Sequence, residues 1–188
     1  MANQTQNILC IKSMFNSDIV ENLYAGVVKC ISESETIEEI EPIYVPGAFE
    51  LPFMANKVIN SSKIKVDCII TLGCVIKGET AHFEYISGSC ANALANLNIN
   101  SKIPVLFGVV TAYNRKQAEE RSQINFDHAD NRNIGFNVAN AAKILLSSET
   151  CVMFPLSSFN RSIPFKYLAF EKLGALLLMA LQYSTFAH

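Results

Sequence analysis

The sequence predicts a three-layer α/β/α sandwich built around a four-stranded parallel sheet. Strand-like and helix-like segments alternate along the chain, as they do in proteins whose helices connect parallel strands. Two strand-like segments, 66–72 and 103–111, are almost continuously apolar, which is typical of central strands that helices cover on both faces. We therefore expect right-handed crossovers and a ligand site at the carboxyl ends of the strands.

The first part of the chain supplies two strands and the helix between them. Residues 8–11 form a short apolar run and predict the first strand. Apolar side chains then recur over 19–31 at the spacing of one helical face, which predicts a helix. Residues 37–45 combine β-forming residues with charges and Pro42, a mixture typical of a strand at the edge of a sheet.

Four further helices are predicted by apolar spacing and by residues that favour helix starts. The helix over about 51–60 has Pro52 in its first turn, where proline is favoured. Apolar residues over 83–97 mark a helix of about four turns. Asn114, with a glutamine three residues later, forms the pattern of a capping box. The last helix covers about 138–145 and follows a polar loop.

Composition divides the chain into two parts. Residues 1–147 contain the strands and helices described above and form the expected α/β domain. Residues 148–188 are rich in Phe, Leu and Ala and form an apolar C-terminal extension of unknown role. The most apolar part of this extension, 173–181, is too short to span a bilayer. We expect it to form a helix that packs on the domain or on another subunit.

The composition also argues against several classes of partner. The net charge is −2 and no basic stripe is visible, so nucleic acid is not the expected partner. No uncharged apolar run reaches about eighteen residues, so a membrane span is not expected. The first residues lack the pattern of a signal peptide, which predicts a cytoplasmic protein. The six cysteines include no Cys-x-x-Cys pair, so we expect small buried side chains and no metal site.

Residues 73–83, Gly-Cys-Val-Ile-Lys-Gly-Glu-Thr-Ala-His-Phe, join a predicted strand to a helix expected to start near Thr80. The free N–H groups and the positive dipole at a helix N-terminus bind anions. Lys77 adds a cation, and the imidazole of His82, one turn into the helix, could transfer protons beside a bound anion. This pattern indicates chemistry on a small phosphorylated molecule. Alternatively, Gly78 only turns the chain and Thr80 is an ordinary helix cap.

Other candidate site residues follow other predicted strands. Phe15 and Phe49 lie in predicted loops, where an aromatic ring could stack on a flat heterocycle; otherwise they are core residues. Glu50 either favours the start of its helix or accepts hydrogen bonds from ligand hydroxyls. Arg121 alone is typical of a solvated face, and His128 of a solvated loop rather than a metal site. The segments expected to meet at one edge of the sheet are 15–16, 47–50, 73–82 and 107–114.

Together these motifs closely resemble the lumazine synthase family, over about residues 8–147. The motifs that carry the resemblance are Phe15-Asn16, Val-Pro-Gly-Ala-Phe-Glu-Leu-Pro at 45–52, the run 72–83, Pro-Val-Leu-Phe-Gly-Val-Val-Thr at 104–111, and Asn114 through Arg121. The resemblance implies a flavodoxin-like sheet. It also implies the penultimate step of riboflavin biosynthesis, in which 5-amino-6-(D-ribitylamino)uracil and 3,4-dihydroxy-2-butanone 4-phosphate condense. The products are 6,7-dimethyl-8-ribityllumazine, phosphate and water, and no metal or organic cofactor takes part.

The resemblance also implies roles for individual residues. The substrate-binding residues that it implies are Phe15, Ala48, Phe49, Glu50, Val75, Ile76 and Phe107. The phosphate-binding residues are Gly78, Glu79, Thr80 and Arg121. Phe15 would stack on the pyrimidine, residues 48–50 would hold the ribityl chain, and His82 would transfer protons. In this family the site lies between adjacent subunits of a pentamer, so Phe107 and Arg121 would come from the neighbouring chain.

The chain departs from the family pattern in three places. Ile134 stands where a phosphate-proximal lysine is usual, and Arg132 lies two residues away. The stretch 121–135 is several residues longer than in members that build icosahedral shells, so we favour a free pentamer or decamer. The extension 148–188 has no counterpart in the family. Ile134 and the extension favour one alternative to an active enzyme, a ligand-binding or scaffold protein of this fold that has lost turnover. A third hypothesis, another phosphate-binding flavodoxin-like protein, is disfavoured by the intact Phe49-Glu50 and His82 motifs.

Overall fold

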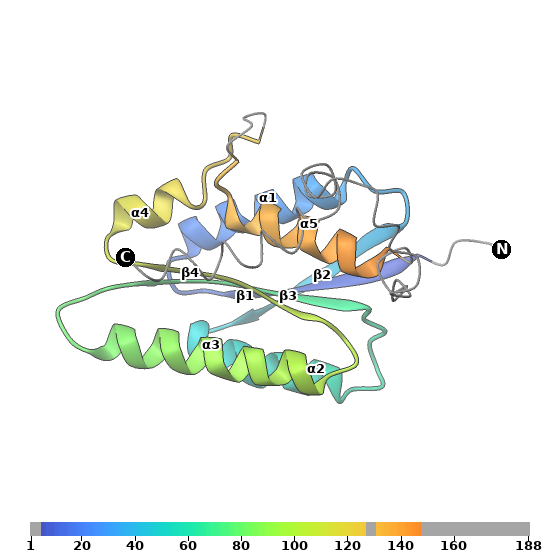
Figure 1. Cartoon of the computed structure of the whole chain (residues 1–188), viewed down its shortest axis with the longest axis horizontal. Coiled ribbons are helices and arrows are strands. Elements are labelled where there is room, and N and C mark those ends of the chain that lie inside the picture. Colours follow the sequence, from blue (N-terminus) through green and yellow to red (C-terminus); the bar gives the residue numbers. More distant parts are fainter. Residues whose placement is uncertain (1–4, 127–130, 148–188) are drawn as a thin grey trace, which may run out of the picture. The chain divides into compact units, whose positions relative to one another are not determined.

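The computed structural model describes residues 5–126 and 131–147, and it confirms the predicted fold class. Its four parallel strands lie in the order β2-β1-β3-β4, with helices on both faces of the sheet (Figure 1). The strands are β1 (Gln6–Ser13), β2 (Ile37–Val45), β3 (Cys68–Ile76) and β4 (Val105–Ala112). The helices are α1 (Ser17–Ile31), the 3-10 turn η1 (Ala48–Glu50), α2 (Leu51–Ile59), α3 (His82–Asn100), α4 (Arg115–Glu120) and α5 (Ile134–Leu146). None of these helices is both long enough and apolar enough to cross a membrane.

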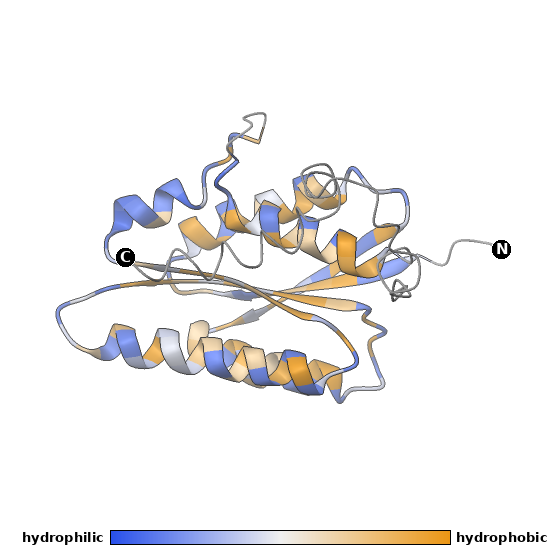
Figure 2. Ribbon diagram, viewed as in Figure 1, coloured by the Kyte–Doolittle hydropathy of each residue, from blue (hydrophilic) through white to orange (hydrophobic). Residues whose placement is uncertain are grey.

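Alternate side chains of the strands pack into two separate apolar layers. On β1, Ile8 and Cys10 pack with residues of α1 and α5, whereas Leu9 and Ile11 pack with residues of α2 and α3. This alternation is the two-residue period of a strand that is buried on both faces. In Figure 2 the apolar residues accordingly lie along the strands and on the helix faces that turn toward them.

Strand β4 lies at one edge of the sheet, whereas its apolar sequence predicted a central strand; this prediction was wrong. Val105 and Val109 pack in the layer of α2 and α3, and Leu106 and Val110 pack in the layer of α1 and α5. Because both faces of β4 are covered, its sequence has the same apolar character as that of β3, although only one strand adjoins it. The apolar pattern records burial of the two faces and not the number of neighbouring strands. The edge position predicted for Ile37–Val45 is confirmed.

Helices α1 and α5 approach each other closely at two glycines. A Cβ on Gly26 would overlap the side-chain amide of Asn133, and a Cβ on Gly135 would overlap the backbone carbonyl of Leu23. Side chains farther along continue the contact, where Lys143 Nζ donates a hydrogen bond to the carbonyl of Cys30 (3.3 Å). The two glycines therefore permit a helix–helix distance that any larger residue would prevent.

A buried polar cluster lies between β1, β2 and α1, and sequence patterns did not predict it. Lys12 is 1% exposed. Its ammonium donates to a carboxylate oxygen of Glu21 at 2.7 Å and lies 3.7 Å from the ring centroid of Tyr24. The pKa of the nearby Glu39 carboxyl is raised, chiefly by burial, although hydrogen bonds from Tyr24 and Cys10 and the charge of Lys12 act in the opposite direction.

Replacing Glu39 with glutamine is expected to stabilise the protein at neutral pH more than at acid pH. A carboxyl group with a raised pKa binds more protons in the folded than in the unfolded chain, so the free energy of unfolding falls as pH rises above the ordinary glutamate pKa of about 4.3. In the glutamine variant, position 39 carries no titratable group, so it does not contribute to this fall in the free energy of unfolding. Thermal melting at pH 4 and pH 7.5 measures the difference in Tm between variant and wild type, with Glu38→Gln at the exposed neighbouring position as control. An equal shift in Tm at both pH values would contradict the prediction.

Candidate active site

The loops that follow the first two strands meet at the carboxyl edge of the sheet, as predicted. The N–H of Phe15, after β1, donates to the carbonyl of Pro46, after β2, at 3.2 Å. Asn16 adopts a left-handed backbone conformation (φ 55°) at the start of α1. Its side-chain amide donates to the carbonyl of Cys74 in β3 at 2.9 Å. These hydrogen bonds place the residues after β1 between the turn after β2 and the end of β3.

The connection between β3 and α3 is fixed at both ends. At its start, the N–H of Lys77 donates to the carbonyl of Ala112, the last residue of β4, at 2.8 Å. Lys77 Nζ lies 3.0 Å from a carboxylate oxygen of Glu84 in the first turn of α3, and this hydrogen bond is the chief cause of a lowered pKa of Glu84. The rings of Phe83 and Tyr113 lie 6.1 Å apart, which joins α3 to the loop after β4.

Residues between these fixed ends are exposed to solvent, and the helix begins later than predicted. Strand β3 continues to Ile76, beyond the predicted end at 72, because its last residues pair with β4. Helix α3 starts at His82, two residues after Thr80, near which its start was predicted. The Thr80 hydroxyl accepts a hydrogen bond from the N–H of His82 at 3.4 Å. This is a contact within the turn, because Ala81 stands at the N-cap of α3 and no side chain caps the helix, and an exposed imidazole stands at the helix end.

Gly78 is not needed for the local fold. Its φ is not positive, and a Cβ at this position would meet no atom within 4 Å. Neither a strained backbone nor close packing within the described chain therefore explains a glycine here. Free space over a backbone N–H is instead what a ligand that approaches the main chain needs.

The two aromatic residues of the candidate site are exposed rather than part of the core. Phe15 is 71% and Phe49 is 56% exposed, while Ala48 between the β2 turn and Phe49 is buried. Glu50 is half-buried, and one of its carboxylate oxygens accepts a hydrogen bond from the N–H of Gly47 at 2.9 Å. Glu50 therefore stabilises the 3-10 turn, and the remaining lone pairs of a carboxylate are open to a second hydrogen bond.

Val75 and Ile76 are the last two residues of β3, and both are half-buried. On one side they pair with Thr111 and Ala112 of β4. On the other side, β1 pairs with β3 only as far as Leu72. The end of β3 therefore presents backbone groups that the sheet does not use, next to the loop that carries Phe15.

Two predicted site residues, Phe107 and Arg121, lie apart from the other candidate site residues of the same chain. Phe107 is the third residue of β4, 38% exposed, and so is far from the carboxyl end where sequence reasoning placed it. Arg121 follows the last turn of α4 and is exposed. Among residues 5–126 and 131–147, no hydrogen bond or ion pair joins either residue to the Lys77–Glu84 pair.

The position of the usual family lysine serves packing in this chain. Ile134 begins α5 and packs against the apolar layer of α1 and α5. Arg132, two residues earlier, is exposed. His128 lies outside the described residues, as does the extension 148–188.

Three residues at or near this edge were missed by sequence reasoning. Tyr113 and Glu84 contact the Lys77 connection from separate elements, and no spacing rule links them to it. Asn133 fixes the start of α5 through its side chain. The last could have been found, because asparagine directly before a helical pattern is a favoured cap.

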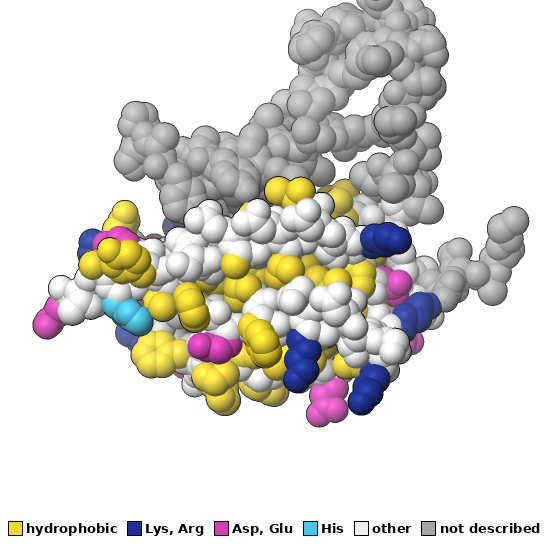
Figure 3. Space-filling view, turned by 90° about the horizontal axis from the view of Figure 1, so that it is seen from below, with side chains coloured by type: hydrophobic (Ala, Val, Ile, Leu, Met, Phe, Trp, Pro, Cys, Tyr) yellow, Lys and Arg dark blue, Asp and Glu magenta, His cyan; other side chains and the backbone are white. Residues whose placement is uncertain are grey.

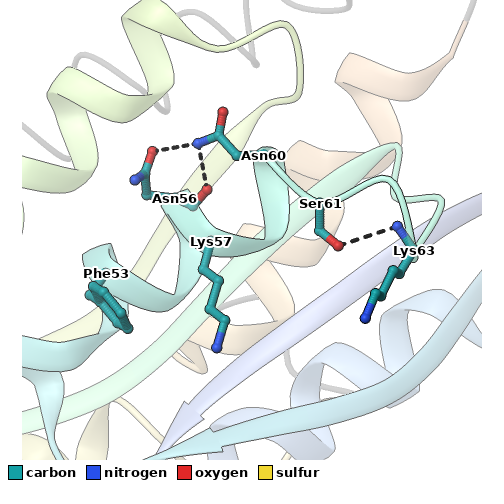
Figure 4. A pocket seen from close by; sticks show the side chains of 6 residues that line it. All are labelled: Phe53, Asn56, Lys57, Asn60, Ser61 and Lys63. Atoms are coloured by element: carbon teal, nitrogen blue, oxygen red, sulfur yellow. Dashed lines mark hydrogen bonds between the residues drawn. The ribbon is translucent and has the colours of Figure 1, made fainter.

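A surface hollow elsewhere on the domain is not part of this group. It lies along α2 and the following loop and is lined by Phe53, Asn56, Lys57, Asn60, Ser61 and Lys63 (Figure 4). The amide of Asn60 is already bonded to the carbonyl of Asn56 at 2.8 Å and to its side chain at 3.0 Å. None of the candidate site residues lines this hollow.

A comparison with protein-family models gives one match over most of the chain. Residues 5–149 match the model described as 6,7-dimethyl-8-ribityllumazine synthase. The matched range contains every strand and helix from β1 to α5 and all of the candidate site residues.

Proposed function

We propose that this chain, which belongs to the 6,7-dimethyl-8-ribityllumazine synthase family, is an active transferase. It condenses 5-amino-6-(D-ribitylamino)uracil with 3,4-dihydroxy-2-butanone 4-phosphate to give 6,7-dimethyl-8-ribityllumazine, phosphate and water. The reaction forms an imine, eliminates phosphate and closes a ring. These steps need proton transfers and an anchored leaving group, and positioning can supply much of the remaining rate.

One observation supports the proposal most strongly. An exposed turn at the N-terminus of α3, with Lys77 before it and His82 at the helix start, lies beside the loop of Phe15 at one edge of the sheet. Groups that can bind an anion, an imidazole and an exposed aromatic ring therefore stand on connections at the same edge of the sheet. A phosphorylated ketone and a flat heterocyclic amine are the substrates that such a set of groups suits.

The uracil substrate binds to the residues after β1, β2 and β3. Phe15 stacks on the pyrimidine, and the backbone groups of Val75 and Ile76 that the sheet leaves unused bond to the edge of the ring. Phe49 and Glu50, with the backbone of Ala48, hold the ribityl hydroxyls. A carboxylate that already accepts a backbone N–H is fixed in position, so a hydroxyl that donates to it loses little additional entropy.

The phosphate of the second substrate binds to the turn after β3. The N–H groups of Gly78, Glu79 and Thr80 and the helix dipole stabilise its charge, and Arg121 adds a guanidinium. His82, at the first position of the same helix, transfers protons during imine formation and phosphate loss. The turn thus holds the phosphate leaving group next to the residue that transfers protons.

Two residues of the proposed site, Phe107 and Arg121, come from a neighbouring chain, so the active form is a homo-oligomer. Large apolar side chains on the surface of α2 and α3, such as Phe53, Tyr85 and Ile99, support subunit contacts on this side of the domain (Figure 3). A pentamer or decamer is proposed rather than an icosahedral shell, because the segment 121–135 is long. Light scattering after size exclusion distinguishes these forms from a megadalton particle.

A second candidate is a ligand-binding protein of the same fold that has lost turnover. One observation favours it, namely that Ile134 packs into the apolar layer where a lysine is usual in the family. This candidate requires that the purified chain binds the ribitylaminouracil but forms no lumazine when both substrates are present.

The test of the proposed function is a steady-state assay of lumazine absorbance with both substrates. The wild-type chain is expected to form product. Arg121→Ala is expected to lose about 1.5 to 3 kcal/mol of charge-assisted hydrogen bonding, or roughly 10- to 150-fold in kcat/KM for the phosphate substrate. Binding without product in the wild type would support the second candidate.

Arg115→Ala is the matched control for Arg121→Ala. Arg115 is exposed on the same helix and pairs with Asp18 and Glu119, so its loss also removes one cation from α4. We expect this variant to keep kcat/KM within about threefold of the wild type, as is usual for exposed ion pairs. Unimpaired turnover in Arg121→Ala would refute its phosphate role.

Gly78→Ala is expected to raise KM for the phosphate substrate by about tenfold, equivalent to about 1.4 kcal/mol. The added methyl group meets no atom of the described chain but stands over the backbone N–H groups proposed to bind phosphate. Thermal melting should show a stability change within about 0.5 kcal/mol. A normal KM with normal stability would show that phosphate does not approach this part of the turn.

A further inference from the structure

We propose that Asn133 is a positioning residue that holds Arg121 where it binds phosphate. The proposal rests on the proposed function, in which Arg121 contacts the leaving group, and it concerns how the fold fixes that arginine. Asn133 touches neither substrate and acts through the backbone on either side of the segment that joins α4 to α5.

Every polar atom of the Asn133 side chain is bonded, and the residue is 0% exposed. Its amide nitrogen donates to the carbonyl of Asn22 in α1 at 3.0 Å and to the carbonyl of Gln123 at 3.1 Å. Its side-chain oxygen accepts the N–H of Phe136 in the first turn of α5 at 3.0 Å. One side chain therefore joins two helices to the chain that leaves α4.

The next residue extends this connection to Arg121 itself. The N–H of Ile134 donates to the carbonyl of Arg121 at 2.9 Å. Together with the bond to Gln123, two hydrogen bonds from consecutive residues hold the backbone on both sides of Ser122, which is 0% exposed. The direction in which the Arg121 side chain leaves the backbone is thus set by α5 and not only by α4.

Helix α4 could not fix Arg121 unaided. It has six residues, and Ala118 is its one buried residue. A helix this short is unstable without tertiary contacts, and the exposed Arg121 side chain contributes little packing. The asparagine bonds add to the tertiary contacts that Ala118 and the Arg115–Asp18 ion pair give the short helix, and they act next to Arg121.

The space around the Asn133 side chain is closely filled, so it accepts only a side chain of the size and shape of asparagine. Gly26 of α1 lies against the Asn133 side chain, where a Cβ would overlap it, and Gly135 permits the first turn of α5 to lie on the backbone of Leu23. A longer amide has no room, and a shorter residue cannot reach both carbonyls. The position therefore requires asparagine.

The test compares Asn133→Ser with the wild-type chain in kinetic assays of both substrates. Serine keeps a hydroxyl that can cap α5 but cannot bond to the two carbonyls. We expect KM for 3,4-dihydroxy-2-butanone 4-phosphate to rise about 10- to 100-fold and KM for the ribitylaminouracil to change less than about twofold. In the Arg121→Ala background, Asn133→Ser should change KM for the phosphate substrate by less than about twofold. The effects of two residues that act through one another are not additive.

Thr71→Val is the matched control for a loss of stability alone. The Thr71 hydroxyl is buried in β3 and donates to the carbonyl of Leu106 at 2.9 Å, so its removal also deletes a buried hydrogen bond. This variant should melt earlier and keep both KM values. A rise of both KM values in Asn133→Ser, additive with Arg121→Ala, would overturn the positioning role and leave a purely structural one.

Two further measurements keep the proposal testable if the serine variant does not fold or the wild type forms no product. Asn133→Asp keeps the size and the capping oxygen, and it replaces the two donated bonds with a carboxylate oxygen that faces the carbonyls of Asn22 and Gln123. Hydrogen exchange of residues 121–126 should accelerate in whichever variant folds, and affinity for inorganic phosphate should fall as in Arg121→Ala. Unchanged exchange and phosphate affinity would refute the role of Asn133, whereas a wild type without product refutes only the proposed function.

Discussion

Replacing His82 with glutamine is expected to lower kcat by about 100- to 10,000-fold, the usual contribution of a general acid or base. His82 is exposed at the first position of α3, next to the turn proposed to bind phosphate, and it is the one histidine among residues 5–126 and 131–147. Glutamine keeps a polar side chain that can donate and accept hydrogen bonds but cannot carry a proton between substrate atoms. Substrate binding should therefore remain nearly unchanged while the chemical steps become slow.

Steady-state rates with both substrates saturating measure this effect, and the KM values report binding. Ser89→Ala is the control, because Ser89 is an exposed hydroxyl-bearing residue of the same helix. It should keep kcat within about twofold, as expected for an exposed substitution. If His82→Gln retained more than a third of the wild-type kcat, His82 would not be the proton-transfer residue.

Replacing Gly135 with alanine is expected to destabilise the domain by about 3 kcal/mol, the upper end of the usual cost of overpacking. The new Cβ would overlap the backbone carbonyl of Leu23. A flexible side chain could rotate away, but a helix backbone cannot, so α1 and α5 must separate. The intrinsic helix preference for alanine over glycine, about 1 kcal/mol, acts in the opposite direction and is too small to compensate.

Gly88→Ala provides the same chemical change at a position with open space. Gly88 lies within α3, and a Cβ there meets no atom within 4 Å, so this variant should gain about 0.5 to 1 kcal/mol. Urea denaturation followed by circular dichroism measures the free energy of unfolding of both variants. If this free energy changed in the same direction in both, the close approach of α1 and α5 would not determine the effect at Gly135.

Sequence patterns predicted the fold class, the element order and the meeting of three loops, because each depends on local periodicity and on the rule that parallel strands end at one edge. They placed β4 wrongly, since its burial comes from helices on both faces and gives no sign of strand order. They ended β3 too early because Gly73 is typical of a turn, whereas here the backbone continues to pair with β4.

The candidate site could be predicted only where one segment carries several groups. The run from Lys77 to His82 is of this kind, and so is the turn that carries Phe49 and Glu50. The meeting of 73–82 and 107–114 was predicted, but the side chains that touch were not. Tyr113 beside Lys77, the bond of Asn133 to Gln123 and the buried ammonium of Lys12 all depend on tertiary packing. The burial of Ile134 likewise depends on which face of α5 meets the layer of α1.

Because α1 packs against α5, the domain can finish folding during synthesis only after α5 has been made. Helix α5 ends at Leu146, whose carbonyl accepts a hydrogen bond from Gln6 at the start of β1 (2.9 Å). Until the ribosome has made α5, the part of α1 that packs on α5 has no cover, and contacts of such large sequence separation form slowly. The nascent chain therefore exposes a helix face that aggregates or recruits a chaperone, so folding yield in cells should depend on how quickly residues 134–146 emerge.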